Sequence, residues 1–349
     1  MTESMKAIIY HAPKNIKLET IDVPDCDEDQ IRVKVDACAV CGTDLKSYLH
    51  GNPRIRAPQV IGHEFTGIID TVGAKTKDFA LGDRMVMATS ISCGDCFYCK
   101  NSLSNLCINL APMGFAYPGG MAEFVTIPKT ALVNGHVVKV PPTVKAEHAA
   151  LAEPLSCAVN CAENCNIQTS DTVVIIGAGP MGIMNACIAK NYGAEKIIIA
   201  EVNPTRLKSA ESFNFDFLID PSSSDLTQAV KDATDGVGAD VVIVAAPAVE
   251  PQEKALTLVR KHGTVCLFAS LPTGGSTISI DSRIIHYGEI HLIGSSDSRP
   301  QHVAKAVDMI ANKTISVDKL ASHIIDMENI FEAFDLMQTG NAMRVVLTP

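Results

Sequence analysis

The sequence predicts an α/β protein in which an antiparallel β domain is joined to a doubly wound parallel sheet. Three observations predict this fold. Short β-like runs with frequent Gly, Pro and Asp breaks fill the first 130 or so residues, unbroken apolar runs alternate with helical patterns from about residue 172, and a glycine-rich turn follows the first of those apolar runs. A chain of 349 residues with 47% hydrophobic and 19% charged content has enough material for two ordinary cores.

The N-terminal part contains the β-like runs "MKAIIY", "IRVKVDACAV", "FTGIIDTVG", "DRMVM", "MAEFVTIP" and "VVKVP". Turn residues bound each run, which indicates short strands joined by long loops. We therefore expect this part to form a barrel-like β domain.

The second part contains six apolar runs, "TVVII", "KIIIA", "FDFLI", "DVVIVAA", "TVCLFAS" and "IHLIG". Continuous Val, Ile and Leu indicate strands covered on both faces, and six such strands form a complete dinucleotide-binding fold. After about residue 297 come two helical patterns, 303–310 and 330–337, and the strand-like "MRVVLTP".

The net charge of −10 disfavours a nucleic-acid backbone or an anionic membrane as a partner, so we expect a small-molecule ligand. The first residues lack a basic region followed by a long apolar run, which favours a cytoplasmic location. Clustered cysteines in that compartment more often bind metal than form disulfides.

The stretch "TVVIIGAGPMG" forms the predicted glycine turn. Gly177 suits the tight turn, Gly179 lets the backbone approach a pyrophosphate, and Gly182 allows close helix–strand packing. Pro180 and Met181 belong to the same predicted cofactor contact, at a helix N-terminus that presents free N–H groups.

The next strand ends at Glu201, about 20 residues after the turn, where the fold places an acid that accepts hydrogen bonds from the adenosine ribose. A carboxylate there repels a 2′-phosphate, so the sequence favours NAD over NADP. Arg206 lies nearby in the sequence and is included among the predicted cofactor residues, because its charge would soften that preference.

The segment "SCGDCFYCKNSLSNLC" follows the pattern Cys-x2-Cys-x2-Cys-x7-Cys. A short loop of this kind can bring four sulfurs to the corners of a tetrahedron, and four thiolates leave no open position, so we expect a structural zinc site. An iron–sulfur cluster and packed reduced thiols are the alternatives. The predicted ligands are Cys93, Cys96, Cys99 and Cys107.

A catalytic metal needs fewer protein ligands and an open position. Cys41 in "AVCGTD", His63 and Glu64 in "IGHEFTG" and Glu153 in "LAEPLS" offer a mixed sulfur, nitrogen and oxygen set. The spacing of these residues does not show that they meet, so their grouping is a hypothesis.

Two further groups have alternative interpretations. Cys157, Cys161 and Cys165 repeat every four positions, which favours a core-facing stripe of small residues over a third metal site. Lys46, Arg54 and Arg56 follow the Cys41 segment and would suit a phosphate or carboxylate on a substrate, or would simply lie in a solvated loop.

The motifs "CGTD", "GHE-x2-G", the four-cysteine lobe, "EPLS" and "GAGPMG", in this order, resemble those of the zinc-dependent medium-chain dehydrogenases, especially the polyol (sorbitol) and threonine dehydrogenase branch. The resemblance covers essentially the whole chain. It implies a GroES-like catalytic domain at residues 1–154 and 291–349, interrupted by a Rossmann NAD-binding domain at residues 155–290.

The resemblance also implies roles for individual residues. Cys41 and His63 match the core ligands of the catalytic zinc, Glu64 matches an alternating ligand, and Glu153 stands where the polyol enzymes have a glutamate. Thr43 matches a hydroxyl residue that relays a proton, and the neighbouring aspartate matches one that orients the histidine ligand.

The implied protein is a cytoplasmic homodimer or homotetramer with two zinc ions per chain. Its implied activity is NAD-linked interconversion of a secondary alcohol and its ketone by hydride transfer, on a polyol, cyclitol, amino-alcohol or sugar phosphate. An NADPH-dependent carbonyl reductase and a non-catalytic NAD-binding redox sensor are the alternatives. The chain departs from the polyol enzymes at Lys46, where a histidine is usual nearby, and at Asp297, where an arginine is expected.

Overall fold

The computed structural model describes residues 3–272 and 274–349. The described chain divides into two compact units, residues 1–156 with 297–349, and residues 157–296. Helix α5 (Ala152–Asn164) carries the chain from the first unit into the second. In the described part of the chain, no helix combines the length and the apolar character that crossing a membrane requires.

The strands of the first unit form a three-stranded sheet in the order β2–β1–β4, a larger sheet in the order β10–β6–β5–β3–β18–β17 with β9 also paired to β3, and the pair β7–β8. All pairs are antiparallel except β17–β18. The strands are β1 (Ser4–Ala12), β2 (Asn15–Asp22), β3 (Ile31–Ala39), β4 (Gln59–Val60), β5 (Glu64–Val72), β6 (Arg84–Met87), β7 (Ser90–Ile91), β8 (Ala111–Pro112), β9 (Phe124–Ile127), β10 (Val137–Val140), β17 (His323–Asp326) and β18 (Val345–Thr348).

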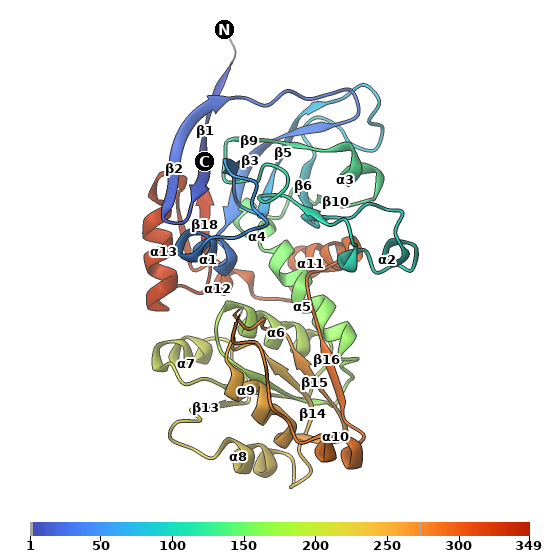
Figure 1. Ribbon diagram of the computed structural model, residues 1–349, viewed down its shortest axis with the longest axis vertical. Coiled ribbons are helices and arrows are strands. Elements are labelled where there is room, and N and C mark those ends of the chain that lie inside the picture. Colours follow the sequence, from blue (N-terminus) through green and yellow to red (C-terminus); the bar gives the residue numbers. More distant parts are fainter. Residues whose placement is uncertain (1–2, 273) are drawn as a thin grey trace. The chain divides into compact units, whose positions relative to one another are not determined.

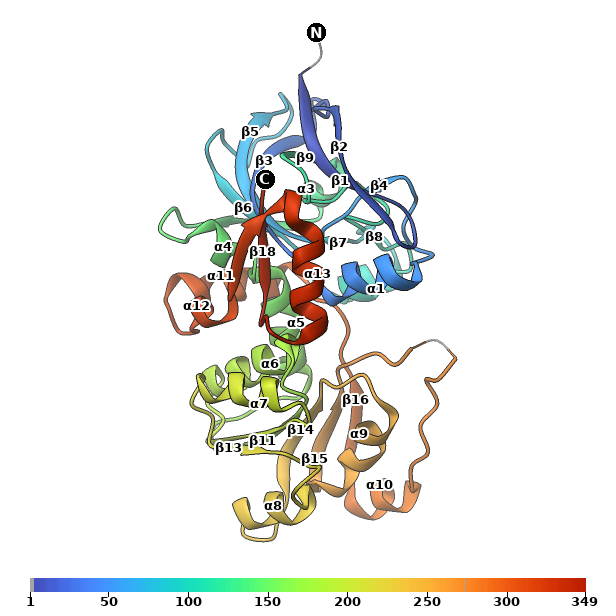
Figure 2. The same ribbon diagram turned by 90° about the vertical axis from the view of Figure 1, so that its left-hand side faces the viewer.

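The helices of the first unit come from both of its sequence segments. Figure 1 shows the red C-terminal strand β18 among the blue N-terminal strands. The strand β18 pairs with β3, and Figure 2 shows α13 running beside it. The helices are α1 (Gly42–His50), α2 (Phe97–Lys100), the 3₁₀ turn η1 (Ser104–Leu106), α3 (Lys129–Val133), α4 (Ala146–Ala149), α11 (Pro300–Ala311), α12 (Val317–Leu320), the 3₁₀ turn η3 (Met327–Asn329) and α13 (Ile330–Thr339).

The core of the first unit joins residues from both of its sequence segments. Phe65, Ile69 and Met85 from the central strands pack in one buried cluster with Phe334 of α13 and Val345 of β18. The C-terminal segment therefore completes the core around which the N-terminal strands fold, which explains why residues so far apart in the chain form one unit.

The second unit is a six-stranded parallel sheet in the order β13–β12–β11–β14–β15–β16, with helices in the connections. The fold class predicted from the sequence is confirmed, and the six predicted runs form the six strands. The elements are β11 (Thr172–Ile176), α6 (Pro180–Asn191), β12 (Lys196–Ala200), α7 (Pro204–Glu211), β13 (Phe217–Ile219), α8 (Leu226–Ala233), β14 (Ala239–Val244), α9 (Val249–Lys254), the 3₁₀ turn η2 (Ala255–Thr257), β15 (Val259–Leu267), α10 (Ser282–Gly288) and β16 (His291–Gly294).

The boundary between the units lies after residue 296, whereas the domain boundary expected from the sequence lies after residue 290. The difference arises because β16 pairs in parallel with β15 and so belongs to the sheet of the second unit. At the other end, the first unit extends to residue 156, within the first part of α5.

Candidate active site and metal centres

Cys41 lies between the end of β3 and the start of α1, where it is the N-cap residue of the helix. Its backbone N–H donates to Asp44 Oδ2 at 2.9 Å, so the aspartate closes the first turn of α1. The Tyr48 ring of α1 stacks on Phe334 with centroids 5.2 Å apart. These contacts hold α1 near both of its ends and so position the backbone that carries Cys41.

His63 and Glu64 stand at the start of β5, beside the end of β3. The two strands pair with Ala39 opposite Glu64, which brings the segment just beyond β3 next to His63. Gly62 has a φ of +93° and a Cβ there would lie 2.5 Å from the Met121 side chain. Only glycine therefore allows the sharp turn that aims His63 toward the Cys41 segment.

The ligand atoms of Cys41, His63 and Glu64 all lie within 4.8 Å of one another. Glu64 Oε2 is buried without a hydrogen-bond partner among the described residues, whereas His63 Nδ1 faces the Asp44 carboxylate. Unpaired polar atoms are costly in a protein interior, and sulfur, imidazole and carboxylate donors together suit zinc. The residues of this group therefore fit a bound zinc ion, and we call them the mixed-ligand cluster.

Asp44 acts on two members of the mixed-ligand cluster. Besides accepting from the Cys41 N–H, its other oxygen lies 3.6 Å from His63 Nδ1. Burial by itself lowers the pKa of His63, but the Asp44 carboxylate and the Cys41 sulfur oppose this more strongly and leave the pKa well above its ordinary value. Asp44 thus orients the imidazole and makes it a better donor to a cation.

Arg344, next to β18, was not among the residues singled out in the sequence. Its Nη2 donates to Glu64 Oε1 at 2.6 Å and its Nη1 donates to the Val40 carbonyl at 3.1 Å. Both side chains of this ion pair are almost fully buried. The Glu64 carboxylate and the Cys41 sulfur hold the pKa of Arg344 above its usual value although burial acts against it, so the arginine remains charged beside the cluster.

Glu153, in the first turn of α5, is buried, but its carboxylate is not among the ligand atoms that the mixed-ligand cluster brings together and groups with that of Asp297 instead. Burial and the Glu64 carboxylate raise its pKa to about 8, whereas His63 acts in the opposite direction. Asp297 also raises this pKa, so the exchange of arginine for aspartate noted in the sequence places a further negative charge near Glu153. Thr43 lies in the first turn of α1, and no hydrogen bond to its side chain occurs within the described residues.

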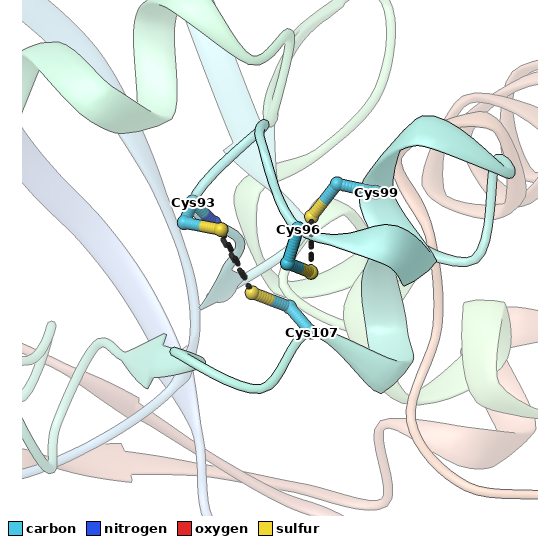
Figure 3. Close-up of side chains that lie close together, drawn as sticks. All are labelled: Cys93, Cys96, Cys99 and Cys107. Atoms are coloured by element: carbon cyan, nitrogen blue, oxygen red, sulfur yellow. Dashed lines mark hydrogen bonds between the residues drawn. The ribbon is translucent and has the colours of Figure 1, made fainter.

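The four cysteines of the predicted structural site form a second cluster, and Figure 3 shows their sulfur atoms turned toward one another. The Sγ atoms of Cys96 and Cys99 are 3.5 Å apart, as are those of Cys107 and Cys93. The short helix α2 presents Cys99, and the 3₁₀ turn η1 leads into Cys107. This spacing suits four thiolates around one ion.

Backbone N–H groups already favour the thiolate form in part of this four-cysteine lobe. N–H donors of Cys99 and Ile108 lower the pKa of Cys96 to about 6, and those of Asp95 and Cys96 lower the pKa of Cys93. Burial raises the pKa of Cys107 to about 12. A bound zinc ion would stabilise all four cysteines as thiolates through its positive charge, including the one whose pKa burial raises. The lobe therefore fits a closed zinc site.

We expect Cys99→Ser to lower the melting temperature by about 5 °C or more, because the lobe loses a ligand that holds α2 in place. Thermal unfolding of the zinc-loaded protein measures this, with Cys26→Ser as the control because Cys26 is a free cysteine of the same unit outside both clusters. An unchanged melting temperature together with unchanged zinc content would refute a structural zinc at the lobe.

The glycine turn of the second unit links β11 to α6. Gly177 has a φ of +107°, and a Cβ on Gly182 would lie 1.8 Å from the Gly177 carbonyl oxygen, so both positions require glycine. Gly179 is the N-cap residue of α6, and the nearest atom to a Cβ there is Arg206 Nη1 at 3.9 Å. The N-terminus of α6, which begins at Pro180, is therefore open to a phosphate.

Glu201 lies buried after β12 and holds this turn in place. Its Oε2 accepts from the Ala178 N–H at 2.7 Å and its Oε1 accepts from the Asn203 N–H at 2.8 Å. Asn203 in turn caps α7 and accepts from the Arg206 N–H. Hydrogen bonds thus connect the glycine turn, Glu201, Asn203 and the backbone of Arg206 in the second unit.

The cysteine stripe of α5 has a partner that the sequence did not indicate. Cys161 and Cys165 are buried, as predicted, whereas Cys157 is only partly buried. The sulfurs of Cys161 and Cys165 group with that of Cys266 on β15. The Cys161 and Cys266 sulfurs are 3.6 Å apart. The position of Cys266 depends on how α5 packs on the sheet, which the spacing of cysteines in the sequence does not reveal.

Comparison with known families supports the arrangement seen in both units. Residues 27–142 match the model of the alcohol dehydrogenase GroES-like domain, and residues 180–312 match that of the zinc-binding dehydrogenases. A sorbitol dehydrogenase from Halalkalibacterium halodurans is 31% identical over 352 residues, covering 99% of both chains. The chain belongs to the zinc-binding dehydrogenase family. It is an alcohol or polyol dehydrogenase linked to NAD or NADP.

Other relatives of this zinc-binding dehydrogenase include a D-arabitol-phosphate dehydrogenase from Enterococcus avium, 31% identical over 99% of this chain and 98% of the relative. Among solved structures, a zinc-binding dehydrogenase from Sinorhizobium meliloti 1021 bound to NADP is 30% identical, with a TM-score of 0.91 over 99% of this chain and 100% of that one. An alcohol dehydrogenase from Escherichia coli CFT073 in complex with NADH is 27% identical, with a TM-score of 0.90 over 99% of both chains.

Proposed function

We propose that this dehydrogenase oxidises a secondary hydroxyl of a polyol or related sugar alcohol to the ketone, with NAD⁺ as hydride acceptor and a zinc ion held by Cys41, His63 and a carboxylate from Glu64 or Glu153. The grouping of the mixed-ligand cluster, with a buried Glu64 oxygen left unpaired, is the observation that carries this proposal. The family of the chain and its polyol dehydrogenase relatives support the reaction class.

In this proposal the protein's own residues prepare the site. Asp44 orients both Cys41 and His63. Arg344 pairs with the Glu64 carboxylate, so that Glu64 is not required as a permanent ligand of the zinc ion. Zinc, when bound, supplies the Lewis acid that makes the substrate hydroxyl easier to deprotonate. The Thr43 hydroxyl, which has no other hydrogen bond within the described residues, is available to pass on the substrate proton.

We assign the remaining features in the same way. The first unit serves as the GroES-like catalytic domain and the second as the Rossmann cofactor domain. One zinc ion occupies the mixed-ligand cluster and a second occupies the four-cysteine lobe, which makes two per chain. A homodimer or homotetramer is supported by the exposed Phe97 and Ile108 side chains, each 72% exposed on the lobe, and light scattering of the purified protein measures its assembly. The cytoplasmic location stays a prediction.

We propose NAD rather than NADP as the physiological cofactor because Glu201 places a carboxylate beside the turn, although a structural relative is solved with NADP. Glu201→Gln keeps an acceptor for the turn but removes the charge, so the ratio of kcat/KM for NAD⁺ to that for NADP⁺ should fall about 10-fold or more. Steady-state kinetics with both cofactors measure the ratio, with the exposed Glu195→Gln as control. An unchanged ratio would show that Glu201 acts only on the turn.

The test of the proposed activity is formation of NADH from NAD⁺ with a panel of substrates. Sorbitol, erythritol, L-threitol, D-arabitol phosphate and L-threonine are substrates named for relatives, and D-arabitol, cyclitols and further amino-alcohols extend the panel. We expect at least one polyol to be oxidised in a zinc-dependent manner. A zinc-loaded protein that oxidises none of these classes with either cofactor would contradict the proposal.

A further inference from the structure

A strongly cationic segment leads from α1 to the mixed-ligand cluster. Residues 45–63 contain Lys46, Arg54 and Arg56 but no Asp or Glu, although the chain as a whole has a net charge of −10. The three side chains are exposed, and none of them is ion-paired with a carboxylate of the described residues. Their positive charge is therefore free to attract an anion.

The loop that carries the two arginines is fixed in place by Phe115. The Arg54 guanidinium carbon lies 4.8 Å from the centroid of the Phe115 ring. The Arg56 backbone N–H donates to the Phe115 carbonyl at 3.1 Å, and the Gln59 side-chain amide donates to the same oxygen at 3.3 Å. Because three contacts converge on one residue, the loop has a defined position rather than that of a freely moving tip.

Phe115 also contacts the mixed-ligand cluster. The centroid of its ring lies 5.4 Å from that of His63. Arg54 and His63 therefore pack against the same aromatic ring, and a guanidinium with free N–H donors stands one ring away from the proposed zinc ligand. The few carbon atoms of a sugar alcohol suffice to join a hydroxyl at the cluster to a charged group at Arg54.

We propose that Arg54, with the field of Lys46 and Arg56, forms an oxyanion subsite that binds a phosphate on the substrate, so that the enzyme acts on a phosphorylated polyol. A guanidinium forms paired hydrogen bonds with phosphate, and stacking on Phe115 holds its plane without using its donors. The inference rests on the proposed function. In the reaction the secondary alcohol loses a hydride to NAD⁺ and a proton to solvent, giving ketone and NADH, and the phosphate ester is unchanged.

The subsite is tested by comparing D-arabitol phosphate with D-arabitol as substrates of the zinc-loaded full chain. In the wild type we expect a higher kcat/KM for the phosphate. Arg54→Met keeps an apolar contact with Phe115 but removes the charge, and should lower kcat/KM for the phosphate about 30-fold, mainly through KM, while that for D-arabitol stays unchanged. Arg54→Lys should restore part of the loss, and Lys17→Met serves as a control on an exposed strand position.

Binding measurements keep this test separate from that of the proposed function. Calorimetric titration with D-arabitol phosphate, with inorganic phosphate and with D-arabinonate distinguishes a phosphate subsite from a general anion or carboxylate subsite. We expect the phosphate compounds to bind the wild type more tightly than D-arabinonate, and Arg54→Met to lose that binding, even if neither sugar alcohol is turned over. Three outcomes would overturn the inference. They are stronger binding of D-arabinonate than of the phosphate compounds, an equal loss of kcat/KM for D-arabitol phosphate and D-arabitol in Arg54→Met, and a change in the KM for NAD⁺ alone.

Discussion

Replacing Cys41 with serine is expected to lower kcat by more than about 100-fold while leaving the fold intact. Cys41 supplies the only sulfur of the mixed-ligand cluster, and its backbone N–H, which the substitution keeps, is bound to Asp44. Loss of the sulfur weakens the hold on zinc at the position where the substrate hydroxyl is activated. Initial rates with the best substrate from the panel, measured in excess NAD⁺, give the size of the loss.

Circular dichroism and the melting temperature show whether Cys41→Ser keeps its fold. Cys26→Ser is a matched control, since it changes a cysteine of the same unit that lies outside the metal clusters, and we expect it to retain wild-type rates. If Cys41→Ser turns over substrate at the wild-type rate, Cys41 is not a ligand of a catalytic zinc.

Replacing Arg344 with methionine is expected to lower the free energy of unfolding by about 3–5 kcal/mol, because the buried Glu64 carboxylate loses its cationic partner. The loss is expected in the metal-free protein, where no cation is present to take the place of the arginine. Urea unfolding after dialysis against a chelator measures it.

Two further variants show that the effect comes from the buried charge. Glu64→Gln combined with Arg344→Met removes both charges and should recover part of the stability. Lys6→Met breaks an ion pair with Glu328 in which both side chains are exposed, and should change stability little. Wild-type stability of Arg344→Met alone would mean that the Glu64 charge is solvated or neutralised by other groups.

The sequence predicted those features that depend on neighbours along the chain. The period of the apolar runs and the glycine turn indicated the parallel sheet because strands buried on both faces and tight turns leave local patterns. The four-cysteine lobe was equally apparent, since the short spacings of Cys93, Cys96 and Cys99 already restrict how their sulfurs can be arranged.

Features that depend on tertiary packing left no such pattern. Arg344 contacts Glu64 across 280 residues of sequence, because β18 pairs with β3 beside the start of β5. Cys266 reaches Cys161 only through the packing of α5 near the end of β15. Phe115 likewise connects Arg54 with His63 through ring contacts that residue spacing does not encode. The grouping of the mixed-ligand cluster was predicted only from the resemblance to the zinc-dependent dehydrogenases. Its physical cause is the register of β3 and β5, which places the segment after β3 beside His63.

The most direct test of the proposed chemistry is the zinc content of the purified chain, measured by mass spectrometry of the metal beside that of Cys41→Ser and Cys99→Ser. We expect two zinc ions per chain in the wild type and one in each variant, since each substitution opens a different cluster. A Cys41→Ser protein that keeps both zinc ions, or a wild type that holds zinc at the four-cysteine lobe alone, would contradict a catalytic zinc at Cys41, His63 and the neighbouring carboxylates.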